Sequence, residues 1–259
     1  MTRKSDDIYW INAGGTLVSR SYPDPKDPPE YVTTLSLSEG GRYIKEAIGE
    51  LSSQVIQKAQ RLRGAMFIDD GHHYGEHWPP RDFGSFIKDS KRFTQTDIDA
   101  LAYLIDRVDQ KKIIINHGTD WMAHNARRLE EALGRLDVKG KQIIFFGAMV
   151  PLIMRKREYE QEQDLLRGDA LANMECALTA IDERAAAPDA PSRVYIVGRS
   201  ARAADTISLL RPEEVDKNKD ASEAHLELTF GARDLSLSFE ETPRKAVQSK
   251  WSVMRGNFR

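Results

Sequence analysis

The chain is poor in cysteine and in long apolar runs. Its 259 residues include one cysteine, Cys176, so no disulfide can form within the chain, which suits a reducing compartment. No stretch approaches the roughly 18 to 20 apolar residues of a membrane span, and the N-terminal residues lack the apolar core of a signal peptide. We therefore expect a cytoplasmic protein that does not enter a membrane.

An excess of charge of one sign is also missing. Lysine and arginine number 38 against 40 aspartate and glutamate, for a net charge of -2. This balance gives no general attraction to nucleic acid, and we do not expect a nucleic-acid partner. The residues 69–78, D-D-G-H-H-Y-G-E-H-W, gather His72, His73 and His77 without a recognised metal-ligand spacing. We interpret them as a polar loop, and expect neither metal nor cofactor.

Short apolar runs alternate with helical periods along most of the chain. The runs are continuously apolar, as in parallel sheets covered on both faces: Ile8–Asn12, Ala65–Ile68, Ile113–Asn116, Ile143–Phe146 and Val194–Val197. Apolar residues at helical spacing predict helices that begin near Thr94 or Thr96, near Met122 and near Leu171, and an earlier helix between Ser38 and Arg63. The alternation predicts an α/β fold, a three-layer sandwich with a mostly parallel sheet.

Two regions break this rhythm. The segment Pro23 to Pro29 is too rich in proline for a helix or a central strand and predicts an exposed loop. Beyond Arg211, the residues His225–Phe230 and Leu235–Phe239 alternate around Gly231-Ala232-Arg233-Asp234, which predicts a hairpin. We expect an α/β domain over residues 1–210, followed by a β-hairpin and basic tail over residues 211–259.

Two threonines stand on tight turns at the ends of two predicted strands. Gly14-Gly15-Thr16 follows the first run, and His117-Gly118-Thr119-Asp120 follows the third. Ligands of open α/β sheets bind outside the carboxyl ends of the strands. A threonine hydroxyl becomes a nucleophile when a neighbouring base takes its proton, and the backbone N–H groups of a glycine turn can stabilise an oxyanion. Asp120 has a simpler alternative role as the cap of the next helix. Together the two turns point to an amide-bond hydrolase.

These motifs resemble those of the bacterial-type asparaginase/glutaminase family. Its members carry G-G-T-I, H-G-T-D-T-M and T-G-A-M-R-P at three strand ends, a D-S segment before a helix, and S-D-G-x-x-N at a later helix start. The corresponding stretches here, in the same order along the chain, are Gly14–Leu17, Asp89-Ser90, His117–Met122, Phe146–Pro151 and Gly168–Asn173. The resemblance spans residues 6 to about 200 and implies the fold of the family's N-terminal domain.

The resemblance also implies roles for individual residues. Thr16 is expected to attack the side-chain amide carbonyl, and Thr119 to activate water or polarise the substrate. Asp120 is expected to hold the substrate's α-amino group and Ser90 its α-carboxylate, with Gly15, Gly118 and Ala148 lining the binding site. A tyrosine that assists Thr16 is expected from the following loop, where Tyr22 is our choice and Tyr31 remains open.

The chain departs from the family in two ways. Members carry a lysine beside the second threonine, in the region that corresponds to Gly198–Thr206, whereas this chain has no lysine between Lys156 and Lys217. Arginine stays protonated and cannot replace it as a base. Lys91 and Arg92, which follow Ser90, are expected in solvent unless they recognise an added anionic group.

The second departure is length, since too few residues follow for the family's C-terminal domain. A more open site and a larger amide-bearing substrate or peptide then become conceivable. The leading hypothesis is an asparaginase-like amidohydrolase that acts on a small amide or amino-acid-like ligand as a homo-oligomer. The alternatives are a non-catalytic sensor on the same scaffold, or a subunit whose site is completed by a partner.

Overall fold

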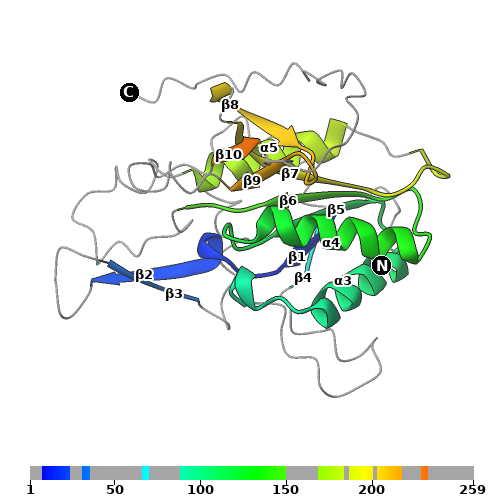
Figure 1. The fold of residues 1–259 in the computed structure, drawn as a ribbon, viewed down its shortest axis with the longest axis horizontal. Helices are drawn as coiled ribbons and strands as arrows, with labels where there is room; N and C mark the ends of the chain where they lie inside the picture. The colour runs from blue at the N-terminus through cyan, green and yellow to red at the C-terminus, as the bar shows by residue number, and fades with distance from the viewer. Residues whose placement is uncertain are drawn as a thin grey trace.

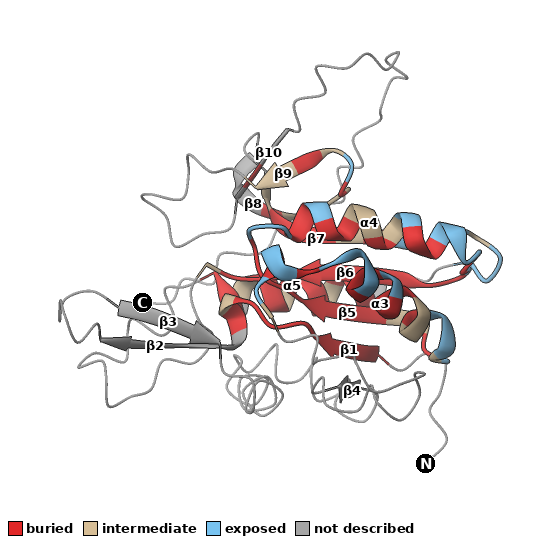
Figure 2. Ribbon diagram, turned by 60° about the horizontal axis from the view of Figure 1, so that its bottom comes forward, coloured by how far each residue is buried: buried red, intermediate tan, exposed pale blue. Residues whose placement is uncertain are grey.

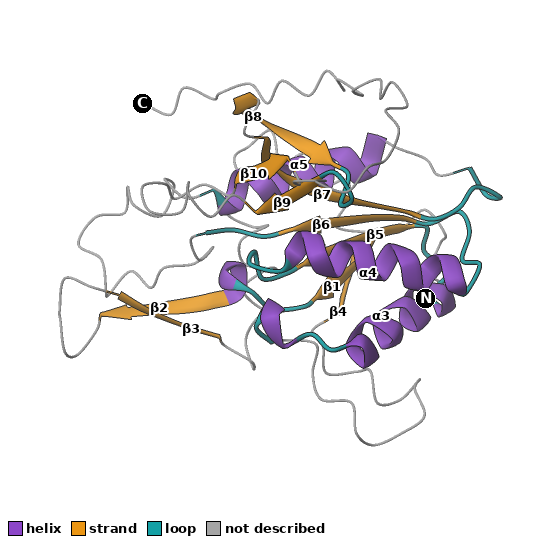
Figure 3. Ribbon diagram, viewed as in Figure 1, coloured by secondary structure: helices purple, strands orange, loops and turns teal. Residues whose placement is uncertain are grey.

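A mostly parallel β-sheet with helices on both faces forms the core of the protein (Figure 1). The structure is a computed structural model and describes residues 8–23, 31–35, 66–69, 88–149, 169–183, 187–200, 203–217 and 229–232. Figure 3 separates the helices, strands and loops of these residues. None of the helices among them is long and apolar enough to span a membrane.

The main sheet has the strand order β4-β1-β5-β6-β7-β10-β9, and β8 pairs with β7 beside this path. The strands β8 and β9 run antiparallel to their neighbours β7 and β10, and the other pairs are parallel. In chain order the strands are β1 (Ile8–Asn12), β4 (Met66–Asp69), β5 (Lys112–Asn116), β6 (Gln142–Phe146), β7 (Arg193–Ser200), β8 (Ala203–Leu210), β9 (Val215–Lys217) and β10 (Thr229–Ala232).

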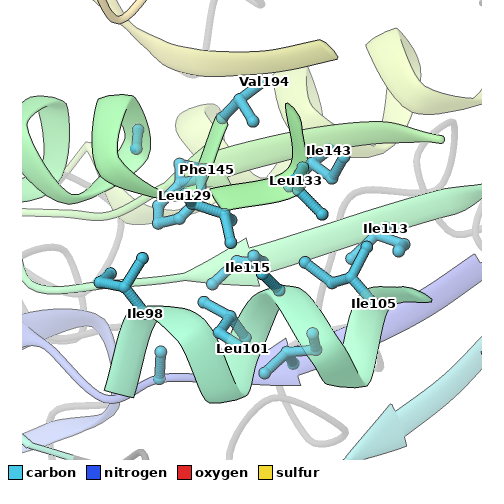
Figure 4. Packing of buried hydrophobic residues seen from close by; sticks show 14 of the residues in the cluster. Ile98, Leu101, Ile105, Ile113, Ile115, Leu129, Leu133, Ile143, Phe145 and Val194 are labelled. Atoms are coloured by element: carbon cyan, nitrogen blue, oxygen red, sulfur yellow. The ribbon is translucent and has the colours of Figure 1, made fainter. Parts of the chain in front are cut away.

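Two hydrophobic layers hold the helices to the sheet. On one face, α3 (Gln95–Arg107) and α4 (Met122–Arg135) pack against strand residues such as Ile113 and Ile115 (Figure 4). On the other face, α5 (Ala170–Glu183) covers Trp10, Ile114 and their neighbours. Because side chains of a strand alternate between faces, the run Ile113-Ile114-Ile115 supplies both layers. The central strands β1, β5 and β6 are accordingly buried, except for the half-buried Lys112 at the start of β5 (Figure 2).

Helix α3 begins with a reciprocal cap that fixes the chain directly after Ser90. The Thr94 side chain accepts a hydrogen bond from the Asp97 backbone N–H, and the Asp97 carboxylate accepts one from the Thr94 backbone N–H. Lys88 forms a 2.7 Å ion pair with the same carboxylate. This capping box satisfies N–H groups that an α-helix leaves free at its start. It therefore anchors the short 3₁₀ turn η2 (Ser90–Arg92) to the body of the protein.

The order of the parallel strands places a topological switch between β1 and β5. From β1 the chain goes to β4 on one side, and then returns to β5 on the other side before continuing outward to β6 and β7. Loops that leave the carboxyl ends of two strands at such a point diverge, and ligands of doubly wound sheets bind there. The turns that carry Thr16 and Thr119 leave β1 and β5, so they flank this switch point.

The structure confirms the expected three-layer α/β fold and corrects some details. Gly231 and Ala232, expected in a hairpin turn, lie in strand β10, because their backbones pair with β9 rather than reversing the chain. A two-stranded ribbon, β2 (Ser19–Pro23) with β3 (Tyr31–Leu35), follows Thr16 where only a loop was predicted.

Other predictions lie outside the described residues. These are the helix between Ser38 and Arg63, the residues 24–29 of the proline-rich segment, the residues 225–228 and the second strand of the hairpin, and the three histidines of residues 70–78. The division of the chain at residue 211 stays a prediction, although β9 and β10 both join the main sheet.

Candidate functional site

Two asparagines lock the ends of β1 and β5 together. Asn12 and Asn116 are partners in the parallel register, and Asn116 Nδ2 donates to Asn12 Oδ1 at 2.7 Å and to the Gly14 carbonyl at 2.9 Å. Asn116 Oδ1 accepts from Trp10 Nε1 at 2.8 Å, and Asn12 Oδ1 also accepts from the Gly14 N–H at 3.0 Å. Both asparagines are fully buried. This network fixes the start of the Gly-Gly-Thr turn against the end of β5.

The Gly-Gly-Thr turn packs directly on the His-Gly-Thr turn. Gly14 and Gly15 have φ values of 81° and 85°, which only glycine adopts without strain. A side chain at Gly15 would bring its Cβ within 2.5 Å of the Gly118 nitrogen. The glycine therefore permits a backbone approach that no other residue allows. Thr16 follows at once, half-buried, and the buried Leu17 anchors the chain beyond it.

Ser90 lies against the same turn from a third direction. A Cβ on Gly118 would come within 2.9 Å of Ser90 Cβ and 3.0 Å of Ser90 Oγ. Ser90 is buried, and its Oγ accepts a hydrogen bond of 3.2 Å from the Trp121 N–H. Because this bond uses a lone pair of the hydroxyl oxygen, the hydroxyl proton remains available to an acceptor such as a carboxylate.

The turn after β6 closes the fourth side. A Cβ on Gly147 would meet the His117 carbonyl at 2.5 Å and Thr119 Cγ2 at 3.1 Å. Two residues at the start of α5 hold this turn: the Asp169 carboxylate accepts from the Met149 N–H at 3.0 Å, and Asn173 Nδ2 donates to the Gly147 carbonyl at 2.9 Å. The segment that resembles S-D-G-x-x-N thus fixes the turn that contains the buried Ala148, whose neighbours Gly147 and Met149 lie against Thr119.

His117 is a buried, neutral support of the turn. Its Nδ1 lies 2.8 Å from the Gly118 carbonyl and donates to it, while Asn125 Nδ2 donates to Nε2 at 3.3 Å. The ring packs between Phe93 and Phe145. Burial lowers the pKa of His117 from 6.5 to about 4, against the weaker raising effect of the Gly118 hydrogen bond. These contacts favour a structural role for His117.

A lysine contacts Thr119 from a part of the chain that the sequence motifs do not reach. Lys217, the last residue of β9, donates to Thr119 Oγ1 at 3.1 Å and to Asp120 Oδ1 at 2.6 Å. The Thr119 hydroxyl in turn donates to Met149 Sδ at 3.6 Å, a weak acceptor. The Lys217 side chain is 13% exposed, against 42% for that of Asp120. The ammonium group thus lies largely out of solvent, directly beside the threonine hydroxyl.

Helix α4 holds the segment that delivers Lys217. Arg127 donates to the carbonyls of Pro212 and Val215 at 2.8 and 3.0 Å, and to Asp216 Oδ1 at 2.9 Å. One turn along, Glu130 receives two hydrogen bonds of 2.9 Å from Arg211. One guanidinium group therefore holds two backbone carbonyls and one carboxylate around the start of β9. Planar forks of this kind suit arginine and not lysine.

Asp120 carries a second lysine on its other oxygen. Lys91 Nζ lies 2.6 Å from Asp120 Oδ2. Burial alone raises the pKa of the Asp120 carboxyl, but the hydrogen bonds from Lys217 and Lys91 outweigh burial and hold that pKa below its usual range. The bond to Asp120 likewise raises the pKa of Lys91. Asp120 is therefore an ionised carboxylate with one ammonium group on each oxygen.

The structure places most of the predicted site residues at one edge of the sheet. Those that meet there are Thr16, Gly15, Thr119, Gly118, Asp120, Ser90 and Ala148. Tyr22 lies in β2 and Tyr31 in β3, and the side chains of both are outside what the structure describes. Sequence reasoning missed Lys217, Asn12 and Asn116. An asparagine two residues before the glycine of each turn was the available signal for the pair, whereas nothing in the local sequence marks Lys217.

Comparison with known proteins agrees with this arrangement. The family model described as "Asparaginase, N-terminal" matches residues 7–219. This range contains all the turns of the site and ends two residues beyond Lys217. A comparison with curated proteins found no match.

The asparagine network should be sensitive to an isosteric change. Asn116→Asp turns the amide that donates to Asn12 Oδ1 and Gly14 O into an acceptor. Unsatisfied or repelling buried groups cost roughly 1–3 kcal/mol each, so we expect a loss of several kcal/mol in unfolding free energy, measured by urea titration. Gln95→Glu makes the same chemical change at an exposed position and should stay within about 0.5 kcal/mol of the wild type. Equal midpoints for the two variants would contradict the proposed lock.

Burial of neutral His117 should make folding sensitive to mild acid. Between pH 6.5 and about 4 the unfolded histidine binds a proton that the folded one excludes, so stability present above pH 6.5 is lost as pH falls through this window. A shift of this size corresponds to roughly 3 kcal/mol. Urea titrations across the window should show this loss in the wild type and in His124→Asn, whose histidine is exposed. His117→Asn should lack it, and an unchanged pH profile in that variant would refute the assignment.

Proposed function

The chain belongs to the asparaginase family, matched through the family's N-terminal domain, and from that membership and the site geometry we propose that it is an amidohydrolase. Its substrate class is a side-chain amide of the asparagine or glutamine type. The observation that carries the proposal is the contact of Lys217 with Thr119 and Asp120, beside the Gly-Gly-Thr turn. It supplies a cation beside the second threonine, where the family's lysine is expected.

In the proposed reaction Thr16 is the nucleophile. Its Oγ attacks the amide carbon and the carbonyl oxygen becomes an oxyanion. The C–N bond then breaks, and the nitrogen takes up the proton that the Thr16 hydroxyl has lost, so that it leaves as ammonia. Water then cleaves the acyl ester, which returns the Thr16 hydroxyl and releases a carboxylate. Backbone N–H groups of the packed glycine turns are suited to stabilise the oxyanion, because the turns are held rigidly before the substrate arrives.

Thr119 and Lys217 form the second half of this machinery. The Lys217 ammonium stabilises negative charge that develops on Thr119 Oγ1 or on a water molecule held by it. The hydroxyl proton of Thr119 is easily redirected, since its present acceptor is only the Met149 sulfur at 3.6 Å. Ser90 donates its free proton to a carboxylate of the substrate. Tyr22 stays our choice for the residue that assists Thr16, with Tyr31 as the alternative.

The contact also bears on the competing hypothesis of a non-catalytic sensor. That hypothesis drew its strength from the missing lysine between Lys156 and Lys217. Lys217 reaches the position by another route, so the absence from the usual segment no longer favours a sensor. Self-association and a cytoplasmic location remain predictions that follow from the family and from the single cysteine.

Ammonia release tests the proposal. The purified chain is assayed with asparagine, glutamine, their monoamide analogues without the amino group, and asparaginyl and glutaminyl peptides. We expect Thr16→Ala and Thr119→Ala to lower kcat by about a thousandfold or more, and Lys217→Met by roughly a hundredfold or more. Lys139→Met is the matched control, because Lys139 pairs with Asp137 at 49% exposure and should leave kcat unchanged. Full activity in both threonine variants, or no ammonia from any substrate, would overturn the proposal.

Arg127 is proposed as a positioning residue that acts through Lys217. Removing its three hydrogen bonds by Arg127→Ala frees the backbone of residues 212–216 from α4. We expect kcat to fall by about tenfold or more while KM changes little. Residues that act as a unit give non-additive losses, so the double variant Arg127→Ala/Lys217→Met should be no slower than Lys217→Met alone.

The double-mutant comparison separates positioning from a general loss of structure. If Arg127 only stabilised the fold, its effect on kcat would multiply with that of Lys217. A further drop in kcat in the double variant, with both proteins folded by circular dichroism, would therefore contradict the positioning role.

A further inference from the structure

Both oxygens of the Asp120 carboxylate are already occupied by ammonium groups of the chain itself. Lys217 Nζ is 2.6 Å from Oδ1, and Lys91 Nζ is 2.6 Å from Oδ2. Bonds of this length between an ammonium and a carboxylate are charge-assisted and are the stronger kind of hydrogen bond. Lys217 also donates a hydrogen bond to Thr119, so its ion pair with Asp120 belongs to the candidate site.

Lys91 is held close to Asp120 by its backbone. The Asp89 carboxylate accepts from the Lys91 N–H at 2.8 Å, and the adjacent Ser90 is buried against Gly118. The capping box of α3 fixes the chain a few residues later. Although the Lys91 side chain is 56% exposed, its starting point is therefore fixed beside the turn that carries Asp120. The ammonium group stands on the same short segment as the Ser90 hydroxyl.

Two ammonium groups share one carboxylate among the described contacts of Asp120. Lys91 and Lys217 both pair with it, while Asp89 accepts from the Lys91 backbone N–H on the neighbouring segment. An incoming ammonium group would meet two ammonium groups that are already bound to the carboxylate oxygens. Like charges at close range cost binding energy, and this is a common way to reject a ligand. An anionic group, in contrast, is attracted.

We propose that the preferred substrates are amides that carry a carboxylate and lack a free ammonium group, with Lys91 as the residue that sets this preference. Monoamides of dicarboxylic acids and N-acylated asparagine or glutamine belong to this class. The inference rests on the proposed amidohydrolase function. Over both steps one water is consumed: its OH ends on the acyl carbon, its other hydrogen returns the Thr16 hydroxyl, and the new carboxylic acid gives its proton to the released ammonia. The products are a dicarboxylate and ammonium, and no oxidant, reductant or cofactor is needed.

The test compares substrates that differ only in the ammonium group. Succinamate is asparagine without its α-amino group, and glutaramate stands in the same relation to glutamine. For the wild-type chain we expect kcat/KM for succinamate to exceed that for asparagine by about tenfold or more. Lys91→Gln removes one ammonium and frees Asp120 Oδ2, so it should raise kcat/KM for asparagine and reverse the ratio. Arg92→Gln is the matched control, because Arg92 is an exposed cation on the same turn without an ion pair to Asp120 among the described contacts.

A binding measurement separates the failure of this inference from the failure of the proposed function. Succinate and aspartate, which differ in the same ammonium group, are titrated calorimetrically into the Thr16→Ala chain with and without Lys91→Gln. Tighter binding of succinate, lost with Lys91→Gln and kept with Arg92→Gln, supports the inference even if no amide releases ammonia. Ammonia release with asparagine preferred by the wild type, or an equal effect of Lys91→Gln and Arg92→Gln, overturns the inference and leaves the amidohydrolase standing.

Discussion

The hydrogen bonds of Asn116 are the constraint on which the candidate site depends. One buried side chain ties the end of β5 to Trp10 and Asn12 of β1 and to Gly14 of the turn that follows. Parallel strands alone fix the spacing of their backbones, but the loops that leave them diverge at a switch point. The asparagine link brings the two loops back together, and Gly15 then allows their backbones to touch. This link therefore keeps the turns that carry Thr16 and Thr119 in contact with each other.

The buried part of the site is neutral, and its charged groups lie nearer to solvent. His117 packs against two phenylalanine rings and donates a hydrogen bond to the Gly118 carbonyl. It stays uncharged, so the buried part of the His-Gly-Thr turn carries no charge at neutral pH. The charges stand further out, on Lys91, Asp120 and Lys217. Lys217 comes from a strand that α4 holds through Arg127, so a late segment of the chain completes a site built by the first strands. The function of such a cation depends on where its charge lies, and different segments of a chain can place a cation at the same point of a site.

The sequence predicted the frame of this site better than its connections. Continuous apolar runs predicted most ends of the central strands to within one residue. Glycine turns at two of those ends located Thr16 and Thr119. Both signals could be used because they are local in the sequence. The Asn12–Asn116 pair depends on strand register, which no single segment encodes. Lys217 lies 98 residues from Thr119 and is delivered by tertiary contacts of α4. The hairpin expected around Gly231 was wrong in part because Gly231 pairs with Asp216 of another segment, and a glycine is compatible with either structure.

Asp120 is subject to two demands that conflict. If its carboxylate also binds an ammonium group of the substrate, its negative charge is shared between two cations. The ion pair between Asp120 and Lys217, the lysine that contacts Thr119, is then weaker. Here the carboxylate pairs with Lys217 on one oxygen and with Lys91 on the other. Lys217 and Lys91 therefore share one anion. Both neutralise the negative charge that would otherwise attract an ammonium group of the substrate. A site arranged in this way gains a fixed cation beside its threonine, and in return it favours ligands that bring a negative charge without a positive one.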